Sequence, residues 1–594
     1  MSMLASLTSA YDRMAQRGEV PPFRYSSERI GFLISLNEDG NPAGKPVDLR
    51  EAKGKKLVAP LMAVPTSFKR PGITPRSFFL WDNTAFSLGI SASQDKDPGP
   101  RLEAFRSLHR NALSDTDDPG LRALLRFIDL WLPERFETLG WPEEMKDQNV
   151  VFALESDRRH HIRIHDRPAA KALWTRLSAE VEGAEAVCLV TGEKAPVARL
   201  HPAIKGVWGA QTSGASIVSF NLDSFESYGH EQGDNAPISE RSASAYTTAL
   251  NRFLESGSKN RIQIGDASTV FWADGSDIKE AEVAESIFSA MLGGEAGTDD
   301  EKIDEQTEAA KVGAVLDGLR KGKPLAELAP ELTKGVRFYV LGLAPNAARL
   351  SIRFWFEDDF GVVAERYRRF VDEMRIEPPP RDPSPPLWRY LVETAAMSKR
   401  ENVPPNLAGE WLRAILTGNN YPLTLLSTVL MRLRADKNVN ALRVAMLKAV
   451  LMRNFNMEVP MAFDPDFTGK GYLLGRLFAV YEQVQSAALG RNVNATIKDK
   501  FYGSASAQPR KVFHLLDSGS ANHLSKIGKQ SPGHRVSLEK RIGAIMDMMT
   551  PGEDPFPASL PSEQQALFGL GYHHQRNEFF KSRETAQAAN EGEH

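Results

Sequence analysis

A proline-rich stretch, EPPPRDPSPP at residues 377–386, separates two parts of the chain that follow different patterns. Proline fixes φ and lacks an amide donor, so we expect an extended connector at this position. Strand and helix patterns are interspersed before it, and the pattern after it is almost entirely helical. The sequence therefore predicts an α+β N-terminal domain with mixed and antiparallel strands, followed by an all-α C-terminal helical bundle.

The part before the connector contains short apolar runs that predict strands. Ile30, Phe32, Ile34 and Leu36 recur at every second position, and Asp39-Gly40 then marks a turn. Further strand-like runs lie at residues 78–81, 150–152, 186–190, 217–220 and 270–272, and helical patterns lie at 101–115, 120–132, 168–182 and 240–255. Residues 338–341 and 350–356, with Pro345-Asn346 between them, predict a hairpin.

The part after the connector is typical of amphipathic helices. In YLLGRLFAVYEQVQSAALG, residues 472–490, Leu473, Leu477, Tyr481 and Val484 fall on one helical face, and Gly490 suits the end of a helix. We expect three regions: an α+β domain at 1–376, the connector with further helices at 377–460, and a basic helical bundle at 461–594.

Charge is unevenly distributed, although the chain as a whole has a net charge of only −3. Residues 274–308 hold twelve acidic residues and two basic ones, which is typical of a solvated, mobile surface segment. Residues 470–541 hold twelve basic residues and four acidic ones. This excess indicates either a track for a phosphate backbone or an ordinary solvated face. A smaller basic group surrounds KRPGITPR at residues 69–76.

Several functional classes are excluded or disfavoured. A single cysteine, Cys188, excludes a disulfide framework and zinc sites built on paired cysteines, and we expect it to be a buried, inert thiol. Arg13 interrupts the N-terminus too early for a signal peptide, and no apolar run is long enough to span a membrane. We therefore expect a cytoplasmic protein. The sequence contains no P-loop, GxSxG, EF-hand or HD motif, and it predicts no catalytic residue, no cofactor and no metal.

Two local features leave alternatives open. His160, His161 and His165 invite a metal-site interpretation, but HHIRIH alternates like a strand and contains no HExxH motif, so exposed or packed histidines are the simpler interpretation. The stretch KGVWGAQTSGASIVSFN at 205–221 is not a GxGxxG nucleotide motif. Its glycines either let backbone approach a ligand closely or form tight turns.

Several longer stretches resemble one family, the large subunit of the type I-C CRISPR interference complex (type I-C Cascade). The resemblance is carried by residues 188–251, which begin CLVTGEKAPVARLHPAIKGVWGAQTSG, by LWDNTAFSLG at 80–89, by GLAPNAARLSIRFW at 342–355 and by residues 474–513. These matches occur in the family's order over most of the chain. The acidic segment and the C-terminal tail are the parts without a match.

The resemblance implies a non-catalytic subunit that caps the guide RNA 5′ end and recognises the protospacer-adjacent motif in double-stranded target DNA. It also implies a part in R-loop formation, in holding the displaced single strand and in recruiting a helicase–nuclease. The implied partners are the guide RNA, the backbone subunits, the guide-processing subunit and a small subunit. Such families make the small subunit by internal translation, for which Met457 and Met461 are the candidate starts here.

The resemblance also suggests individual contact residues. Candidates for recognising the DNA motif are Lys69, Arg70, Lys205, Gly206, Gly209, Gln211, Gly214, Tyr228, Gly229 and Asn235, since amides read base edges and glycine admits close approach. Each of these has a structural alternative, as a turn or hydrogen-bonding residue. Candidates for the DNA backbone track are Arg476, Arg491, Lys498, Lys500, Arg510, Lys511, Lys526 and Lys529.

Two competing functions remain open from the sequence. The first is a metal-independent ribonuclease or a nuclease of the same CRISPR system, for which the His160, His161 and His165 cluster is the only evident source of catalytic groups. The second is a scaffold that contacts protein alone. Salt-dependent binding to duplex DNA would argue against the scaffold.

Overall fold

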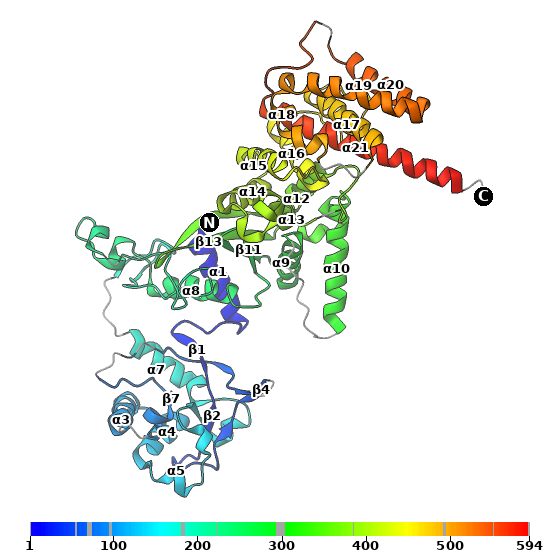
Figure 1. Cartoon of the computed structure of the whole chain (residues 1–594). Helices are drawn as coiled ribbons and strands as arrows, with labels where there is room; N and C mark the ends of the chain where they lie inside the picture. Colours follow the sequence, from blue (N-terminus) through cyan, green and yellow to red (C-terminus); the bar gives the residue numbers. More distant parts are fainter. Residues whose placement is uncertain are drawn as a thin grey trace. The chain divides into compact units, whose positions relative to one another are not determined.

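The computed structural model describes residues 2–53, 56–67, 70, 74–93, 98–179, 185–220, 222–292, 303–383, 385–490, 495–550 and 552–591. The chain forms two compact units (Figure 1). The first contains Met1–Ile204 and Val218–Arg252, and the second contains Lys205–Ile217 and Phe253–His594. Mixed strands and helices precede a mainly helical C-terminal part, which confirms the predicted fold class.

The first unit is built on a four-stranded mixed sheet in the order β3-β2-β8-β7. β2 (Phe32–Leu36) runs parallel to β8 (Asn149–Leu154), with Ile34 opposite Phe152, while β3 (Val47–Asp48) and β7 (Trp81–Asn83) are antiparallel neighbours. Both central strands are almost entirely buried. A strand that is buried on both faces reads as a continuous apolar run, as this sequence does at 150–154.

Two helices cover this sheet, α3 (Gly99–Leu113) and α4 (Pro119–Leu130). They confirm the helical patterns at 101–115 and 120–132. The ring of Phe152 on β8 lies 6.3 Å from that of Phe105 on α3 and 5.6 Å from that of Phe127 on α4, so one aromatic cluster joins all three elements. The unit also includes α1 (Met3–Gln16), α7 (Pro168–Ala179) and most of α8 (Glu240–Phe253), with the strand pairs β1 (Tyr25–Arg29)–β6 (Leu61–Pro65), β4 (Glu51–Lys53)–β5 (Lys56–Val58) and β9 (Glu185–Val187)–β10 (Lys194–Pro196).

The second unit begins with an antiparallel sheet in the order β11-β12-β13-β14. Its strands are β11 (Arg261–Ile264), β12 (Ala267–Asp274), β13 (Arg337–Asn346) and β14 (Arg349–Asp359). The hairpin predicted from residues 338–341 and 350–356 is therefore confirmed. Its turn lies at Ala347-Ala348 rather than at Pro345-Asn346, because Asn346 still pairs with Arg349. The strand expected at 217–220 is absent, and the isolated bridge between Ser216 and Arg349 lies just before it.

The prediction of a solvated, mobile segment at residues 274–308 is wrong for the first half of that range. Residues Ile278–Leu292 form helix α9, and Ala284, Ile287 and Phe288 are fully or almost fully buried in the core. Of the acidic residues on α9, Glu282 is exposed and Glu280 is half-buried, while Glu285 accepts hydrogen bonds from the Ala273 amide and from Asn260 Nδ2, both at 2.8 Å. A charge count over the window adds both faces together, so it hides the buried one. Helix α10 (Ile303–Arg320) follows, and residues 293–302 lie outside the described part of the chain.

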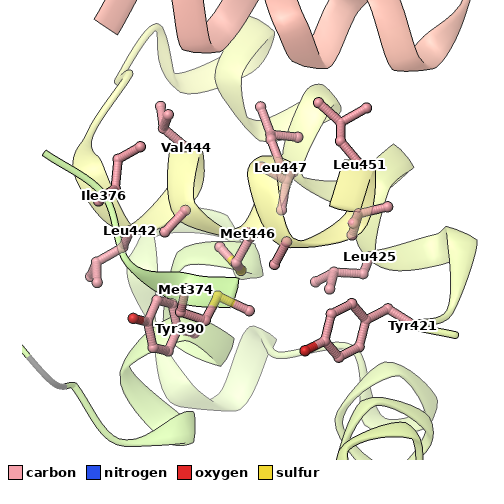
Figure 2. Close-up of a cluster of buried hydrophobic side chains, with 14 of the residues drawn as sticks. Met374, Ile376, Tyr390, Tyr421, Leu425, Leu442, Val444, Met446, Leu447 and Leu451 are labelled. Atoms are coloured by element: carbon pink, nitrogen blue, oxygen red, sulfur yellow. The ribbon is translucent and has the colours of Figure 1, made fainter. Parts of the chain in front are cut away.

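Helices make up the rest of the second unit around one continuous core that runs from Ile264 to Tyr572. They are α12 (Phe360–Met374), α13 (Leu387–Thr394), α14 (Pro405–Thr417), α15 (Leu423–Asp436), α16 (Ala441–Phe455), α17 (Lys470–Leu489), α18 (Ile497–Ala507), α19 (Phe513–Gln530), α20 (Pro532–Asp547) and α21 (Ser562–Glu591). Figure 2 shows Val444, Leu447 and Leu451 on one side of α16 and Met374 and Tyr421 on the other. Whether 461–594 folds separately stays a prediction.

Helices α17 and α21 approach each other so closely that glycines are required at the crossing. A Cβ on Gly471 or Gly475 would lie 2.1 Å from a carbonyl oxygen of α21, and a Cβ on Gly571 would lie 2.0 Å from the carbonyl oxygen of Tyr472. Real Cβ atoms do not approach a backbone this closely, so any side chain here must separate the helices. The last helix is therefore part of the bundle core.

We expect Gly571→Ala to destabilise the second unit by about 1–3 kcal/mol, because the added methyl forces α21 away from α17. Chemical unfolding of the full chain measures this effect. The matched control is Gly543→Ala on α20, where a Cβ has no neighbour within 4 Å. Alanine stabilises an open helical position by roughly 0.5–1 kcal/mol relative to glycine, so the two variants should shift the transition in opposite directions. Equal shifts would contradict the close crossing.

Candidate nucleic-acid interface

The loop at residues 205–217 is fixed to the sheet of the second unit by its backbone. Gly206 has φ of +84°, and a Cβ there would lie 2.6 Å from the carbonyl oxygen of Leu254, so only glycine fits. Val207 is buried beside it. The amide of Trp208 donates to Ser268 Oγ at 2.9 Å, and Ser268 is itself fully buried. This loop therefore has a defined conformation although it contains no regular element.

The far end of the same loop lies against the β13–β14 turn. The Leu350 amide donates to the Ser216 carbonyl at 2.9 Å, and a Cβ on Gly209 would lie 3.4 Å from Pro345 Cγ. Of the predicted contact residues here, Lys205 and Gln211 are exposed, and the three glycines all have positive φ. Five of the predicted contact residues thus lie on one loop: Lys205, Gly206, Gly209, Gln211 and Gly214. The β13–β14 turn lies beside this loop, and sequence reasoning did not predict that proximity.

The second predicted loop, at residues 226–237, belongs to the first unit. Tyr228 is fully exposed at its tip, and Tyr228 and Gly229 both have positive φ, between the bridged residues Ser227 and His230. The side-chain amide of Asn235 accepts from the Ser227 amide at 3.0 Å and donates to the carbonyls of His230 and Gln232 at 3.0 and 3.1 Å. Asn235 therefore closes this loop, in agreement with the alternative interpretation of this residue as a structural, hydrogen-bonding one. Its side-chain amide already forms hydrogen bonds within the loop.

Arg70 is half-buried and is engaged by partners within the first unit. Its Nη2 lies 2.6 Å from both carboxylate oxygens of Asp82, and its Nε donates to the Arg76 carbonyl at 2.9 Å. Its guanidinium carbon lies 4.0 and 3.7 Å from the ring centroids of Phe78 and Phe86. Burial raises the pKa of the fully buried Asp82 carboxyl, and Arg70 opposes that shift. This geometry favours a structural role for Arg70 over the predicted grip on phosphate.

Four of the predicted backbone-track residues lie exposed on the C-terminal helices: Lys500, Lys511, Lys526 and Lys529. None of the four forms an ion pair with a carboxylate in the part of the chain that the structure describes. Arg510 differs because it pairs with Asp554, and Lys498 is half-buried next to Asp499. Lys69 and Arg491 lie outside the described residues. The exposed lysines are the groups that a nucleic-acid backbone would reach at least cost.

Arg476 is a correction to the predicted track. Its side chain is only 6% exposed, its Nε donates to Gln575 Oε1 at 3.2 Å, and its Nη1 donates to the Pro465 carbonyl at 2.8 Å. It lies on α17, whose neighbouring positions fill the bundle core. A guanidinium that is buried and hydrogen-bonded here joins α17 to α21 and is not available to a phosphate on the surface. The surrounding apolar letters, LLGRLFAV, are the sequence signal for this burial.

The histidine cluster does not form the expected strand. Residues Glu155–Arg158 are a helical turn and Ile164–Asp166 a 3₁₀ turn; His160 and His161 are exposed, whereas His165 is buried. Within the described ranges, no group of three or more His, Cys, Asp or Glu side chains is arranged to hold a metal ion. Cys188 is buried, as expected. Burial raises the pKa of its thiol, but hydrogen bonds led by those from Ser239 outweigh this and lower it to about 6.

Trp208 is an exposed candidate contact residue that sequence reasoning missed. Its side chain is 67% exposed in the loop that carries Lys205 and Gln211. A tryptophan set between two glycines in a polar loop is the signal that would have singled it out. Tryptophan is enriched where proteins bind other molecules, since its large ring loses contact with water on binding at a small entropic cost.

A comparison with protein-family models finds one match along almost the whole chain. The model described as CRISPR-associated protein (Cas_Csd1) matches residues 7–580. The chain matches no curated protein. In the described residues, no helix has both the length and the apolar character that crossing a membrane requires.

Proposed function

The chain belongs to the CRISPR-associated Csd1 family, and from this membership we propose that it is the large subunit of a type I-C guide-RNA surveillance complex. The observation that carries the proposal is a family match that spans residues 7–580. In this role the chain caps the guide RNA 5′ end, recognises the protospacer-adjacent motif in duplex DNA and promotes R-loop formation. It also holds the displaced strand and helps to recruit the helicase–nuclease.

The test of this proposal is assembly and target binding. The full chain is co-expressed with guide RNA, the backbone subunits and the guide-processing subunit of its own system. We expect it to purify with them and to be required for binding duplex DNA that carries the correct motif. A complex that forms without this chain and binds target equally well would refute the proposal.

Motif recognition is assigned to the loop at 205–217, since it places exposed Lys205 and Gln211 on a backbone that is held in a defined conformation. An amide side chain reads base edges, and a lysine attracts the adjacent phosphates. Asn235 supports the second loop from within, so its effect on DNA is indirect. Tyr228 remains a candidate for direct contact because its side chain is fully exposed.

The displaced strand is assigned to Lys500, Lys511, Lys526 and Lys529, which are exposed on and beside α18 and α19. We expect the fourfold change of these lysines to glutamate to weaken binding of single-stranded DNA strongly. The slope of log affinity against log salt concentration should fall by about 3, since each lost contact to a single strand contributes about 0.7. Fluorescence anisotropy at several salt concentrations measures both quantities.

A matched control variant carries the same change of charge elsewhere. Lys45, Lys171, Lys259 and Lys334 are also exposed, and their change to glutamate alters the net charge equally. We expect this control to retain most of the salt slope. If the two variants lose affinity for single-stranded DNA equally, binding depends on the net charge of the chain and not on these four lysines. The assignment of the displaced strand to them then fails.

We propose that the chain has no catalytic activity of its own, because no catalytic motif is present in its sequence. Purified protein incubated with repeat RNA and with DNA, with and without Mg²⁺, should leave both intact. Cleavage that is lost when His161 and His165 are changed to alanine would support the ribonuclease or nuclease alternative instead.

We also propose that translation from Met457 or Met461 supplies the small subunit of the complex. The fragment would contain α17 to α21 and would lack α16, against which α21 packs: Leu447 lies 3.1 Å from the position of a Cβ on Gly569. The separate fragment must therefore cover this apolar face by another contact. Changing both methionines to leucine should remove a band of about 15 kDa from the purified complex; its persistence would refute the internal start.

A further inference from the structure

We propose that Trp208 is a stacking platform for an unpaired nucleobase of the bound nucleic acid. The inference rests on the function proposed above and adds a specific contact to it. The ligand class is a base that has left its pair, together with its phosphodiester backbone, from either DNA or RNA. Base–aromatic stacking does not depend strongly on sequence, since every base has a π-face.

The indole is exposed to an unusual degree for the largest apolar side chain. Trp208 is 67% exposed, whereas Trp81, Trp131, Trp272 and Trp411 are at most 1% exposed. A large exposed aromatic ring gains from any partner that covers it, and aromatic residues therefore recur at binding hot spots. The ring stays mostly exposed, although the loop packs closely at the positions before and after it.

The backbone that carries the indole is held on both sides. Val207 is buried before it, the Trp208 amide is bonded to buried Ser268, and Gly206 fits only as glycine against Leu254. Gly209 follows with φ of +75° and lies against Pro345 of the hairpin. A ring presented on an ordered backbone loses little conformational entropy on binding, which favours a recognition role over a chance exposure.

The surroundings of the indole favour nucleic acid over protein. Residues 205–217 and the hairpin turn at 345–349 contain two basic residues, Lys205 and Arg349, and no acidic residue. Exposed Gln211 and Asn346 add amide groups. An aromatic ring next to cations and amides is the combination that single-strand binding proteins use, with stacking for the bases and charge for the phosphates. Opening of a duplex supplies the unpaired bases that such a ring requires.

The test separates contacts to bases from contacts to phosphates. The purified full chain is titrated against a labelled 12-nucleotide oligo-dT, the same length of abasic DNA, and oligo-U. Wild type should bind the base-containing strands more tightly than the abasic one. Trp208→Ala should weaken oligo-dT or oligo-U binding by roughly 5- to 100-fold and leave abasic binding unchanged. The oligonucleotide whose affinity falls more on Trp208→Ala, oligo-dT or oligo-U, identifies the stacked strand as DNA or RNA.

Three further variants define the result. Trp208→Phe should restore most of the preference for bases, Lys205→Ala should weaken all strands evenly, and Leu189→Ala, with the same exposed fraction of 67%, should change nothing. If wild type binds but Trp208→Ala keeps the full preference for bases, the inference is overturned. It is also overturned if Trp208→Ala loses only a protein partner of the complex. If wild type binds no strand at all, the proposed function fails as well.

Discussion

Arg70→Ala is expected to destabilise the first unit by about 3–5 kcal/mol, a larger loss than for any other substitution proposed for this chain. The side chain of Asp82 is fully buried and that of Arg70 is 24% exposed, so removing the arginine leaves a buried carboxylate without its counter-charge. Three donors remain, the Ser77 hydroxyl and the amides of Phe78 and Asn83. They orient the carboxylate but do not neutralise it.

The control for Arg70 is an exposed ion pair of the same chemistry. Arg110 donates to Asp129 at 2.8 Å, and both side chains are about half exposed. Exposed pairs contribute at most about 1 kcal/mol, so Arg110→Ala should shift the urea transition of the full chain only slightly. Adding Asp82→Asn to Arg70→Ala should recover part of the loss, because the stranded charge is then absent.

The same variants decide between the structural and the DNA-binding interpretation of Arg70. In buffer that keeps both proteins folded, Arg70→Ala should bind motif-containing DNA like wild type. If instead it unfolds like Arg110→Ala and binds DNA more weakly, Arg70 contacts phosphate, and the sequence-based prediction stands.

The fold was predictable wherever one pattern repeats over several residues. The runs at 101–115 and 120–132 are α3 and α4, and the alternation at 350–356 lies within β14. Such patterns reflect the burial of one face, which is a local property of the sequence. The hairpin turn was misplaced by two residues because Pro345 tolerates a strand position near a hairpin end, and proline alone does not fix the turn.

Long-range partners explain what the sequence did not reveal. Arg476 and Lys529 are both cations in one basic stretch, but the first lies inside the α17–α21 contact and the second is exposed. Asn235 has the chemistry to read a base, and its hydrogen bonds to residues three to eight positions away instead use that chemistry to close a loop. Composition reports which groups are present, and only the fold decides which of them still face solvent.

The charge of Lys448 is expected to cost stability that a neutral side chain would recover. Lys448 lies on α16 with 2% of its surface exposed, and its Nζ donates to Met452 Sδ at 3.1 Å. Burial lowers its pKa from 10.5 to about 8, although Glu373 and Asp372 act in the opposite direction. Glu373 does not depend on this lysine, since Arg453 lies 2.8 Å from its carboxylate and the Tyr421 hydroxyl donates to it at 2.7 Å.

The sign of the effect follows from the lowered pKa. Below pH 8 the lysine is charged in both the folded and the unfolded state, and its burial costs about 3 kcal/mol, which is the energetic equivalent of the shift. Between pH 8 and 10.5 only the unfolded state keeps the proton, so this cost diminishes as the pH rises. Lys448→Met keeps an unbranched side chain that is shorter by one atom and removes the charge. We expect it to raise the free energy of unfolding by about 3 kcal/mol at pH 7, with a gain that shrinks above pH 8.

Urea unfolding of the full chain at pH 7 and at pH 9.5 measures this gain, with Lys529→Met as the exposed control that should change little at either pH. A variant that is less stable than wild type at pH 7 would show that the amine stabilises Glu373 more than its burial costs. A gain that is equal at both values would assign the effect to packing around α16 instead of to charge. Only a gain that falls with rising pH identifies a buried ammonium, since the titration of that one group is what differs between the two proteins.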